Sequence, residues 1–437
     1  MPTSSETSTT ETTTARTDEY VEDFARFVAA SPSSYHAAAE MGRRLDAAGF
    51  TRLDEAHEWA PLPTTAYVVR DGAVIAWNQP QDPGPTTPFR ILGAHTDSPG
   101  FKLKPKPSTG SHGWLQVGVE IYGGPLLNSW LDRELELAGR LVTRDGTEHL
   151  VRTGPFLRIP QLAVHLDRDA NTGLTLDRQR HTSPVYGVGE RGGSDVVGHL
   201  AALAGVTAED VAGYDVLTAD TAPGARFGLD GSLFASGRMD NLTSVFAGLR
   251  ALLATAESAT AAHMSVLAAF DHEELGSESR SGASGPFLDD VLTRLTGALG
   301  ATPSQRLQAY AASWCLSADA GHSVHPNYPE KHDPANQPVA GRGPLLKING
   351  NQRYATDGVG AALWARTCEA AGVRYQEFVS NNTVPCGSTI GPLTATRLGI
   401  RTVDVGVPLL SMHSARELAH VDDLAALGSA VEAFFRG

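Results

Sequence analysis

The stretch MSVLAAFDHEELGS, residues 264–277, indicates how the rest of the chain is organised. Its apolar run from Val266 to Phe270 is typical of a buried strand, and this strand ends abruptly at the ionisable residues Asp271 to Glu274. Adjacent carboxylates such as Glu273 and Glu274 repel each other, so a fold that holds both near its interior needs a cation or a proton beside them. A metal site with a neighbouring general base meets this need. A solvated acidic loop is the alternative.

The composition is that of a soluble globular protein, and the length suggests more than one domain. The chain has 437 residues, of which 41% are hydrophobic and 19% are charged. Its formal net charge of -14 argues against nucleic acid or an anionic membrane as the main partner. The cysteines Cys315, Cys368 and Cys386 have no CxxC spacing, so we expect reduced thiols and a cytoplasmic location. No apolar run is long enough to predict a membrane span.

The pattern of helix-like and strand-like segments changes twice along the chain and predicts an interrupted catalytic domain. Residues 1–17 are rich in Thr, Ser and Glu and lack the features of a secretory signal, so they are predicted to be a disordered tail. Residues 18–99 begin the catalytic domain, and residues 234–437 complete it. Between them, at residues 100–233, short β-like runs alternate with Gly and Pro turns, which predicts an inserted β-rich domain.

Strands and helices alternate in the two outer segments and predict an α/β fold. We expect a mixed, mostly parallel sheet with helices on both faces. The predicted helices are 19–30, 35–48, 242–254, 287–299, 359–371, 390–398 and 422–435. The predicted strands are 67–69, 74–77, 88–94, 266–270, 314–318, 375–380 and 402–407. Within the insertion, β-like runs are 115–121, 137–142 and 156–159, and 196–204 is helical.

Ionisable residues stand at the ends of several of these elements. Because ligand sites in open α/β sheets form at the carboxyl ends of the strands, distant positions of this kind can converge. Histidines and carboxylates without cysteine suit Zn²⁺, with Mn²⁺ or Co²⁺ as alternatives, and a spare Glu would make the site hydrolytic. The local alternatives are a helix N-cap for Asp240 and a capped surface turn for His95 and Asp97. The candidate residues are His95, Asp97, Asp240, Glu273, Glu274, Asp319 and His413.

A series of motifs resembles the aspartyl aminopeptidase family of di-zinc metallopeptidases. The motifs follow one another in the order of that family and span nearly the whole chain after the tail. They are GAHTDSPGFKLKP (93–105), SGRMDN (236–241), FDHEELGS (270–277), SADAGHSVHPNYPEKH (317–332), KINGNQRYAT (347–356), VPCGSTIGP (384–392) and SMHSARE (411–417).

The resemblance implies two zinc ions per subunit and a ligand set for each of them. Asp240 would be the carboxylate that bridges both ions. His95 and Asp319 would complete the coordination of one ion, and Glu274 and His413 that of the other. His322 and His325 are interpreted as loop residues outside this ligand set.

The resemblance also implies the roles of the remaining site residues. Glu273 would be the general base for attack by a zinc-bound water, and Asp97 would be its catalytic partner. His165, in the insertion, matches a histidine that members of the family project into a neighbouring subunit's active site. Lys347 and Tyr354 match positions that line the substrate pocket.

The implied activity is removal of an N-terminal residue, preferably Asp or Glu, from peptides. The implied assembly is a homo-oligomer, a tetrahedral dodecamer of dimers in which the inserted domain mediates dimerisation. One alternative is a neutral-residue aminopeptidase or a deacylase on the same fold. The other is a catalytically silent, self-assembling cargo or scaffold protein, although no ligand position is degraded in this sequence.

Overall fold

The computed structural model describes residues 4–190, 195–256 and 261–437 of the chain. In spatial order, the central sheet contains β1 (Thr51–Arg52), β2 (Thr65–Arg70), β3 (Ala73–Asn78), β13 (Met264–Phe270), β4 (Phe89–His95), β14 (Trp314–Ala318), β18 (Arg401–Gly406), β16 (Leu345–Ile348) and β17 (Gln376–Val379). The neighbours β13, β4, β14 and β18 are parallel, whereas β3 and β16 join this group in the antiparallel sense. The prediction of a mixed, mostly parallel sheet is confirmed.

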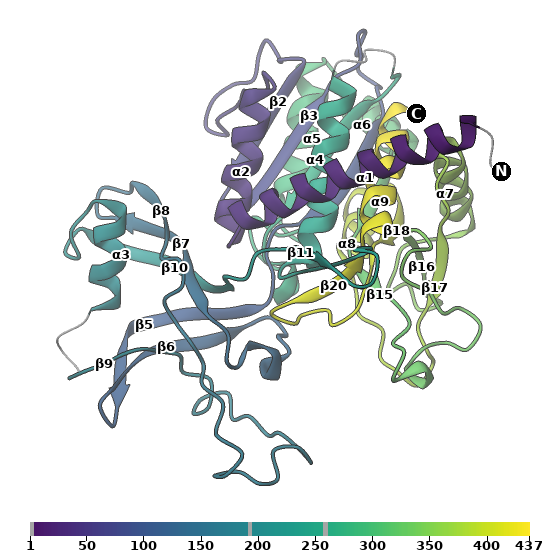
Figure 1. The fold of residues 1–437 in the computed structure, drawn as a ribbon. Helices are drawn as coiled ribbons and strands as arrows, with labels where there is room; N and C mark the ends of the chain where they lie inside the picture. Colours follow the sequence, from purple (N-terminus) through teal and green to yellow (C-terminus); the bar gives the residue numbers. More distant parts are fainter. Residues whose placement is uncertain (1–3, 191–194, 257–260) are drawn as a thin grey trace.

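Helices cover both faces of this sheet, as predicted (Figure 1). One face packs against α1 (Ser4–Ala30), α2 (Ser34–Ala47), α4 (Met239–Ala256), α7 (Gly358–Ala371) and α9 (Val421–Arg436). The other face packs against α5 (Phe287–Ala298), α6 (Pro303–Ala312) and α8 (Ile390–Leu398). None of the helices in the described ranges is long and apolar enough to cross a membrane.

The continuous apolar run of β13 is explained by its burial on both sides. Side chains alternate along a strand, so Leu267 and Ala269 enter the core under α4 while Val266 and Ala268 enter the core under α5. The first of these helices lies very close to the sheet. A Cβ at Gly248 would stand 2.2 Å from the Leu92 side chain and 2.7 Å from that of Leu267. This glycine therefore permits the close approach that fixes α4 over the central strands.

The inserted domain is an antiparallel sheet that projects to one side of the catalytic domain (Figure 1). In spatial order it contains β8 (Glu148–Arg152), β7 (Leu135–Thr143), β10 (Val211–Asp220), β5 (Gly100–Ser111), β6 (Trp114–Tyr122) and β9 (Val185–Val188), with α3 (Val196–Ala204) and the short helix η1 (Leu127–Trp130) beside it. These elements run from Gly100 to Asp220, and the domain limits 100–233 stay a prediction. The β-like run at 156–159 forms only isolated bridges.

The chain returns to the catalytic domain through a small third sheet. Here β12 (Leu233–Ser236) pairs with β11 (Ala225–Phe227) on one side and with β20 (Glu417–His420) on the other. The remaining short elements are η2 (Glu273–Leu275), β15 (Gly321–His322), η3 (Pro329–Lys331) and β19 (Pro408–Leu409).

The structure differs from the sequence-based expectation at two helices. The first, α1, begins at Ser4 and so runs through most of the predicted disordered tail, 1–17. Its later turns are held by buried Val21, Phe24 and Phe27, which anchor a helix that can continue toward the N-terminus. The second, α6, has no predicted counterpart, although the reciprocal capping box of Thr302 and Gln305 marks its start.

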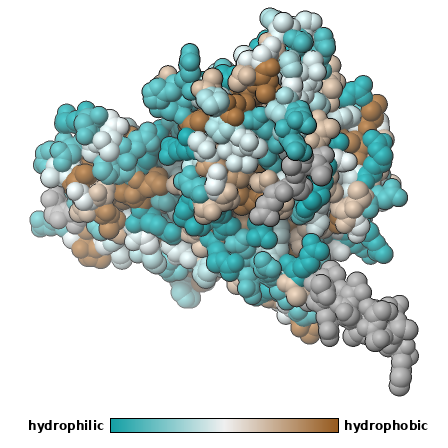
Figure 2. Space-filling view, turned by 90° about the horizontal axis from the view of Figure 1, so that it is seen from above, coloured by the Kyte–Doolittle hydropathy of each residue, from teal (hydrophilic) through white to brown (hydrophobic). Residues whose placement is uncertain are grey.

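The face of the molecule seen in Figure 2 is largely hydrophilic, with hydrophobic residues interspersed among polar ones. The cysteines fit the expectation of reduced thiols, since Cys315, Cys368 and Cys386 are all free.

Candidate metal centre

Strand register places three of the candidate segments side by side. β4 ends at His95, which is paired with Phe270 at the end of β13, so the acidic segment after Phe270 begins beside this histidine. β14 lies on the other side of β4, with Ser317 opposite Gly93. Asp319, two residues further along, is therefore level with His95. The apolar strands and their polar ends thus gather these side chains at one edge of the sheet.

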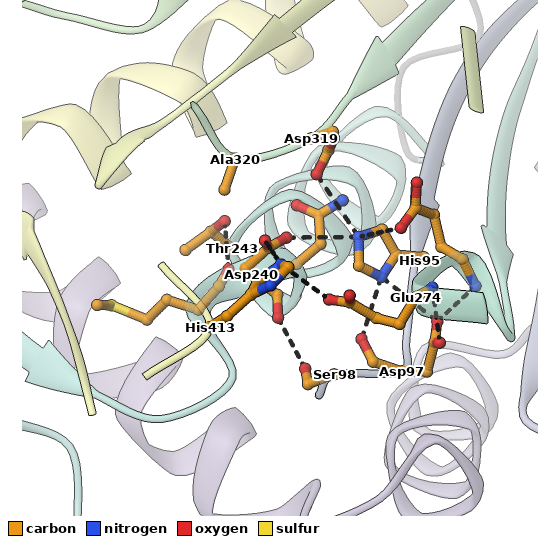
Figure 3. A network of polar contacts seen from close by, with 12 residues as sticks. His95, Asp97, Ser98, Asp240, Thr243, Glu274, Asp319, Ala320 and His413 are labelled. Carbon is orange, nitrogen blue, oxygen red and sulfur yellow. Dashed lines mark hydrogen bonds and ion pairs between the residues drawn. The ribbon is translucent and has the colours of Figure 1, made fainter. Parts of the chain in front are cut away.

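Asp240 lies between the two candidate histidines. Its backbone is extended rather than helical, with φ -82° and ψ 103°, although it stands within the first turn of α4. Its Oδ1 is 3.4 Å from His95 Nε2, and its Oδ2 is 3.3 Å from His413 Nε2 (Figure 3). One carboxylate thus faces a different imidazole with each oxygen.

Two further carboxylates complete a symmetric arrangement. Asp319 Oδ1 is 3.5 Å from His95 Nε2, and Glu274 Oε1 is 3.5 Å from His413 Nε2. Ligand atoms of His95, Asp240 and Asp319 lie close enough together to hold one ion, as do those of Asp240, Glu274 and His413. Asp240 belongs to both groups. A further group of this kind contains His95, Glu273 and Glu274.

The chemistry of the donor atoms fits Zn²⁺. Asp240 Oδ1 and Glu274 Oε1 are buried, and within the described part of the chain they have no hydrogen-bond partner. Burying carboxylate oxygens that accept no hydrogen bond is costly unless a cation compensates their charge. Imidazole nitrogens and carboxylate oxygens are borderline ligands of the type that zinc accepts.

The electrostatics of the centre reflect several buried carboxylates close together. Burial raises the pKa of the Glu273 carboxyl to about 7; the His95 charge opposes this shift, and Asp319 reinforces it. Burial would lower the pKa of His413, but its hydrogen bond to Asp240 and the charge of Glu274 raise it to about 10. Protons on the histidines balance the carboxylates, and a divalent ion that binds here would displace them.

Asp97 holds the acidic segment Glu273–Glu274 through hydrogen bonds to its backbone. Its Oδ1 accepts the backbone N–H of Glu273 at 3.0 Å, and its Oδ2 accepts that of Glu274 at 3.1 Å. The same Oδ2 accepts the hydroxyl of Tyr122 at 2.9 Å. The Nδ1 of His95 lies 3.0 Å from the Asp97 carbonyl oxygen. This carboxylate therefore holds η2, and with it both glutamates, against the end of β4.

Lys347 and Tyr354 lie next to this centre. Lys347 comes from β16 and is only 2% exposed. Its Nζ donates to the Ala320 carbonyl at 2.7 Å and lies 3.4 Å from Asp319 Oδ2. The same ammonium is 5.4 Å from the centre of the Tyr354 ring. Tyr354 in turn lines a cavity of about 340 Å³ that extends toward Tyr328 and Cys386.

His165 is not among the candidate ligand groups of the described residues. It is exposed and lies in an irregular segment of the inserted domain, between β8 and β9. His322 and His325 belong to none of the candidate ligand groups among the described residues. They line the cavity beside Tyr354 instead.

Three residues that support the centre are not among the sequence-based candidates. Tyr122 lies outside the quoted motifs. Ser98 belongs to GAHTDSPGFKLKP without an expected role there, and it donates its hydroxyl to the Asp240 carbonyl at 2.7 Å. Glu417 accepts backbone N–H groups of both Asp240 and His413. The only available signal for Glu417 is its position in the SMHSARE motif.

The chain matches one protein family over almost its whole length. Residues 27–435 match the model described as aminopeptidase I zinc metalloprotease (M18). A relative from Streptomyces avermitilis, a probable M18 family aminopeptidase 2, is 53% identical over 96% of this chain and 98% of its own. A protein of the same description from Mycobacterium bovis is 47% identical over 93% of this chain and 96% of its own.

Solved structures show the same architecture. The structure of the Ape4 and Nbr1 complex contains a chain that superposes with a TM-score of 0.93 at 33% identity, covering 97% of this chain and 86% of that one. The mApe1 dodecamer of S. cerevisiae gives a TM-score of 0.84 at 27% identity, with coverage of 95% and 96%. The M18 aminopeptidase of Thermotoga maritima gives 0.86 at 26% identity, with 96% of each chain covered. Together with the geometry of its metal centre, these matches establish that the chain belongs to the M18 family of zinc-dependent aminopeptidases.

Proposed function

We propose that this aminopeptidase prefers peptides whose N-terminal residue is Asp or Glu and that it works with two Zn²⁺ ions per subunit. Mn²⁺ or Co²⁺ are the alternative ions. Asp240 would bridge the two ions, with His95 and Asp319 on one side and Glu274 and His413 on the other. The support for this assignment is that Asp240 directs one oxygen to each histidine.

The proposed catalytic step is attack of water on the scissile carbonyl. When bound, zinc supplies Lewis acidity toward the carbonyl and the water. Glu273 accepts the proton of the attacking water and returns it to the leaving amine, because its carboxyl has a pKa near neutrality and reaches to within 3.9 Å of His95 Nε2. Asp97 keeps this glutamate in place through the backbone N–H that it accepts.

The cavity beside Tyr354 is the observation that supports a preference for acidic residues. Among the described residues that line it there is no carboxylate, although the chain as a whole carries a charge of -14. Lys331 and three histidines line it, and the buried ammonium of Lys347 lies 5.4 Å from the centre of the Tyr354 ring. A carboxylate side chain of a substrate would therefore meet positive charge and hydrogen-bond donors in a partly desolvated space.

We further propose that the enzyme is a cytoplasmic homo-oligomer, a tetrahedral dodecamer of dimers, in which His165 reaches a neighbouring subunit's site. The likeness to a chain that is solved as a dodecamer supports this assembly. The surroundings of His165 also support it, because Leu162, Val164 and Leu166 expose apolar side chains, with Leu166 74% exposed. Such a cluster gains stability when a partner covers it.

The substrate preference is tested with a panel of aminoacyl chromogens on the zinc-loaded enzyme. We expect kcat/KM for Asp and Glu derivatives to exceed that for Asn, Ala and Leu derivatives by on the order of a hundredfold. The Glu273→Gln variant measures the background hydrolysis. Better hydrolysis of Leu derivatives would instead identify a neutral aminopeptidase, and better hydrolysis of acylated amino acids would identify a deacylase. Absence of zinc in the protein and of all hydrolysis would identify a silent scaffold.

A further inference from the structure

We propose that Glu417 is a positioning residue that sets the distance between the metal ligands Asp240 and His413. Its Oε2 accepts the backbone N–H of Asp240 at 3.0 Å, and its Oε1 accepts the backbone N–H of His413 at 2.9 Å. Each oxygen of one carboxylate thus holds a different ligand by its main chain. Glu417 is 2% exposed, so water does not compete freely for these bonds.

The pairing of β12 with β20 brings this side chain between the two ligands. In that pairing Ser236 is opposite Glu417. Asp240 follows Ser236 by four residues at the start of α4, and His413 precedes Glu417 by four residues in the turn before β20. The two ligands are far apart in the sequence, and Glu417 joins them directly.

Both ligands need such support because neither sits in regular backbone. Asp240 has extended dihedral angles although it lies in the first turn of α4. His413 has a φ of 64°, in the left-handed region that residues other than glycine rarely adopt. The Asp240 peptide is also held by Ser98, and Nδ1 of the His413 ring lies 3.0 Å from the Gly124 carbonyl oxygen. With these contacts in place, His413 Nε2 faces Asp240 and Glu274.

The deciding experiment measures zinc affinity of the Glu417→Gln variant by competition with a chromogenic chelator, without substrate. Glutamine has nearly the same size, but it has one acceptor oxygen, and its NH₂ group would face one of the two backbone N–H donors. We expect zinc affinity at the site of His413 to fall about 10- to 100-fold, the usual effect of losing a contact that orients a metal ligand.

The matched control is Glu136→Gln. Glu136 is also 2% exposed, but it lies in the inserted domain and pairs with Arg152 rather than with a ligand. We expect the zinc affinity of the Glu136→Gln variant to equal that of the unmodified protein. Equal loss in both variants would show a general effect of removing a buried carboxylate and would overturn the proposal.

A second variant and a double-mutant cycle keep the test decisive if glutamine disturbs folding. Glu417→Asp retains the charge but is too short to reach both N–H groups, so it should also bind zinc more weakly; unchanged affinity would overturn the proposal. In a His413→Ala background Glu417→Gln should cost much less zinc affinity, because one ligand that it orients is gone. Circular dichroism of the metal-free proteins reports folding separately.

This inference rests on the proposed metal site and not on the proposed substrate. If the unmodified protein binds neither zinc nor Mn²⁺ or Co²⁺, the proposed function fails. If it binds zinc and Glu417→Gln and Glu417→Asp bind it equally well, only the role of Glu417 fails.

Discussion

Asp97 accepts the backbone N–H of Glu273 at 3.0 Å, so the proposed base is positioned through its main chain while its carboxylate stays available to the site. The other oxygen of Asp97 holds Glu274 in the same manner. Burial and the neighbouring negative charges disfavour the ionised forms of Glu273 and Glu274 and raise the pKa of both carboxyl groups. The two hydrogen bonds to Asp97 fix the positions of these glutamates through their main chain.

Asp97→Asn should therefore lower kcat about 10- to 100-fold with a smaller change in KM. An amide oxygen can accept only one of the two N–H groups, and its NH₂ would repel the other. Steady-state kinetics on an Asp chromogen measure this effect. Tyr122→Phe is the control, since it removes one contact to Asp97 and leaves both glutamates bound; we expect a change of a few fold at most. Equal kinetics of Asp97→Asn and the unmodified enzyme would mean that η2 holds itself in place.

Glu273→Gln should lower kcat by roughly 10²- to 10⁴-fold while zinc content stays nearly the same. The substitution removes the proton acceptor and keeps the size of the side chain. Elemental analysis beside initial rates separates the two effects. Retained turnover would exclude Glu273 as the base, and loss of zinc would make it a ligand, as its proximity to His95 and Glu274 would allow.

Local patterns in the sequence predict those residues of the candidate metal centre that stand at the ends of strands. The apolar runs of β13, β4 and β14 are each followed by polar residues, and the rule that ligands bind at carboxyl ends of parallel strands brings Glu273, His95 and Asp319 together. The approach of Asp240 to His413 depends on the pairing of β12 with β20, which no periodicity indicates. Only the motif resemblance predicts it.

The contacts of Tyr122 with Asp97 and of Glu417 with Asp240 escape prediction because they join residues that are distant in the sequence. Tyr122 ends a strand of the inserted domain and reaches Asp97 across the domain boundary. Glu417 is one acid among many until its strand register is known. By contrast, the start of α6 has a local signal in the sequence, since Thr302 is an N-cap residue and Pro303 occupies the first helical position. This helix could therefore have been predicted from the sequence.

His36 should make the metal-free protein less stable in mild acid. Burial lowers its pKa to about 4, and the charges of Arg152 and Arg238 act in the same direction. The unfolded chain binds a proton near pH 6.5, so between about pH 6.5 and 4 it holds more protons than the folded chain and stability falls as the pH falls. At pH 5 the free energy of unfolding that is lost through His36 is about 2 kcal/mol.

Urea unfolding with a chelator at pH 7 and pH 5 tests this contribution. The loss of unfolding free energy on acidification should be smaller by about 2 kcal/mol in His36→Asn than in the unmodified protein. His263 is also buried with a pKa lowered to about 4, but it titrates in both proteins and cancels in the comparison. Equal losses in the two proteins would show that His36 is protonated in the fold.

Lys347→Met should reduce kcat/KM for Asp and Glu substrates by on the order of a hundredfold and change that for Asn or Leu substrates little. The reason is that the substitution removes a buried ammonium 5.4 Å from the ring of Tyr354, and Tyr354 lines a cavity without acidic residues among those described. Lys104→Met, a lysine of the inserted domain that contacts Gln179, controls for loss of one positive charge. Because Lys347 also contacts Asp319, a parallel loss on all substrates together with zinc would assign it to the metal site instead.

His165→Phe should abolish activity without removing zinc, because His165 is exposed and belongs to none of the candidate ligand groups among the described residues. If it completes a partner's site, mixing this variant with Glu273→Gln under conditions of subunit exchange should restore activity. In a dimer with two equivalent sites, random mixing at equal amounts leaves about a quarter of all sites with both residues intact. Native mass spectrometry verifies the exchange, and Leu166→Asp, which places a charge in the neighbouring apolar cluster, should prevent both assembly and recovery. Mixed dimers without recovered activity would restrict His165 to its own chain or exclude it from catalysis.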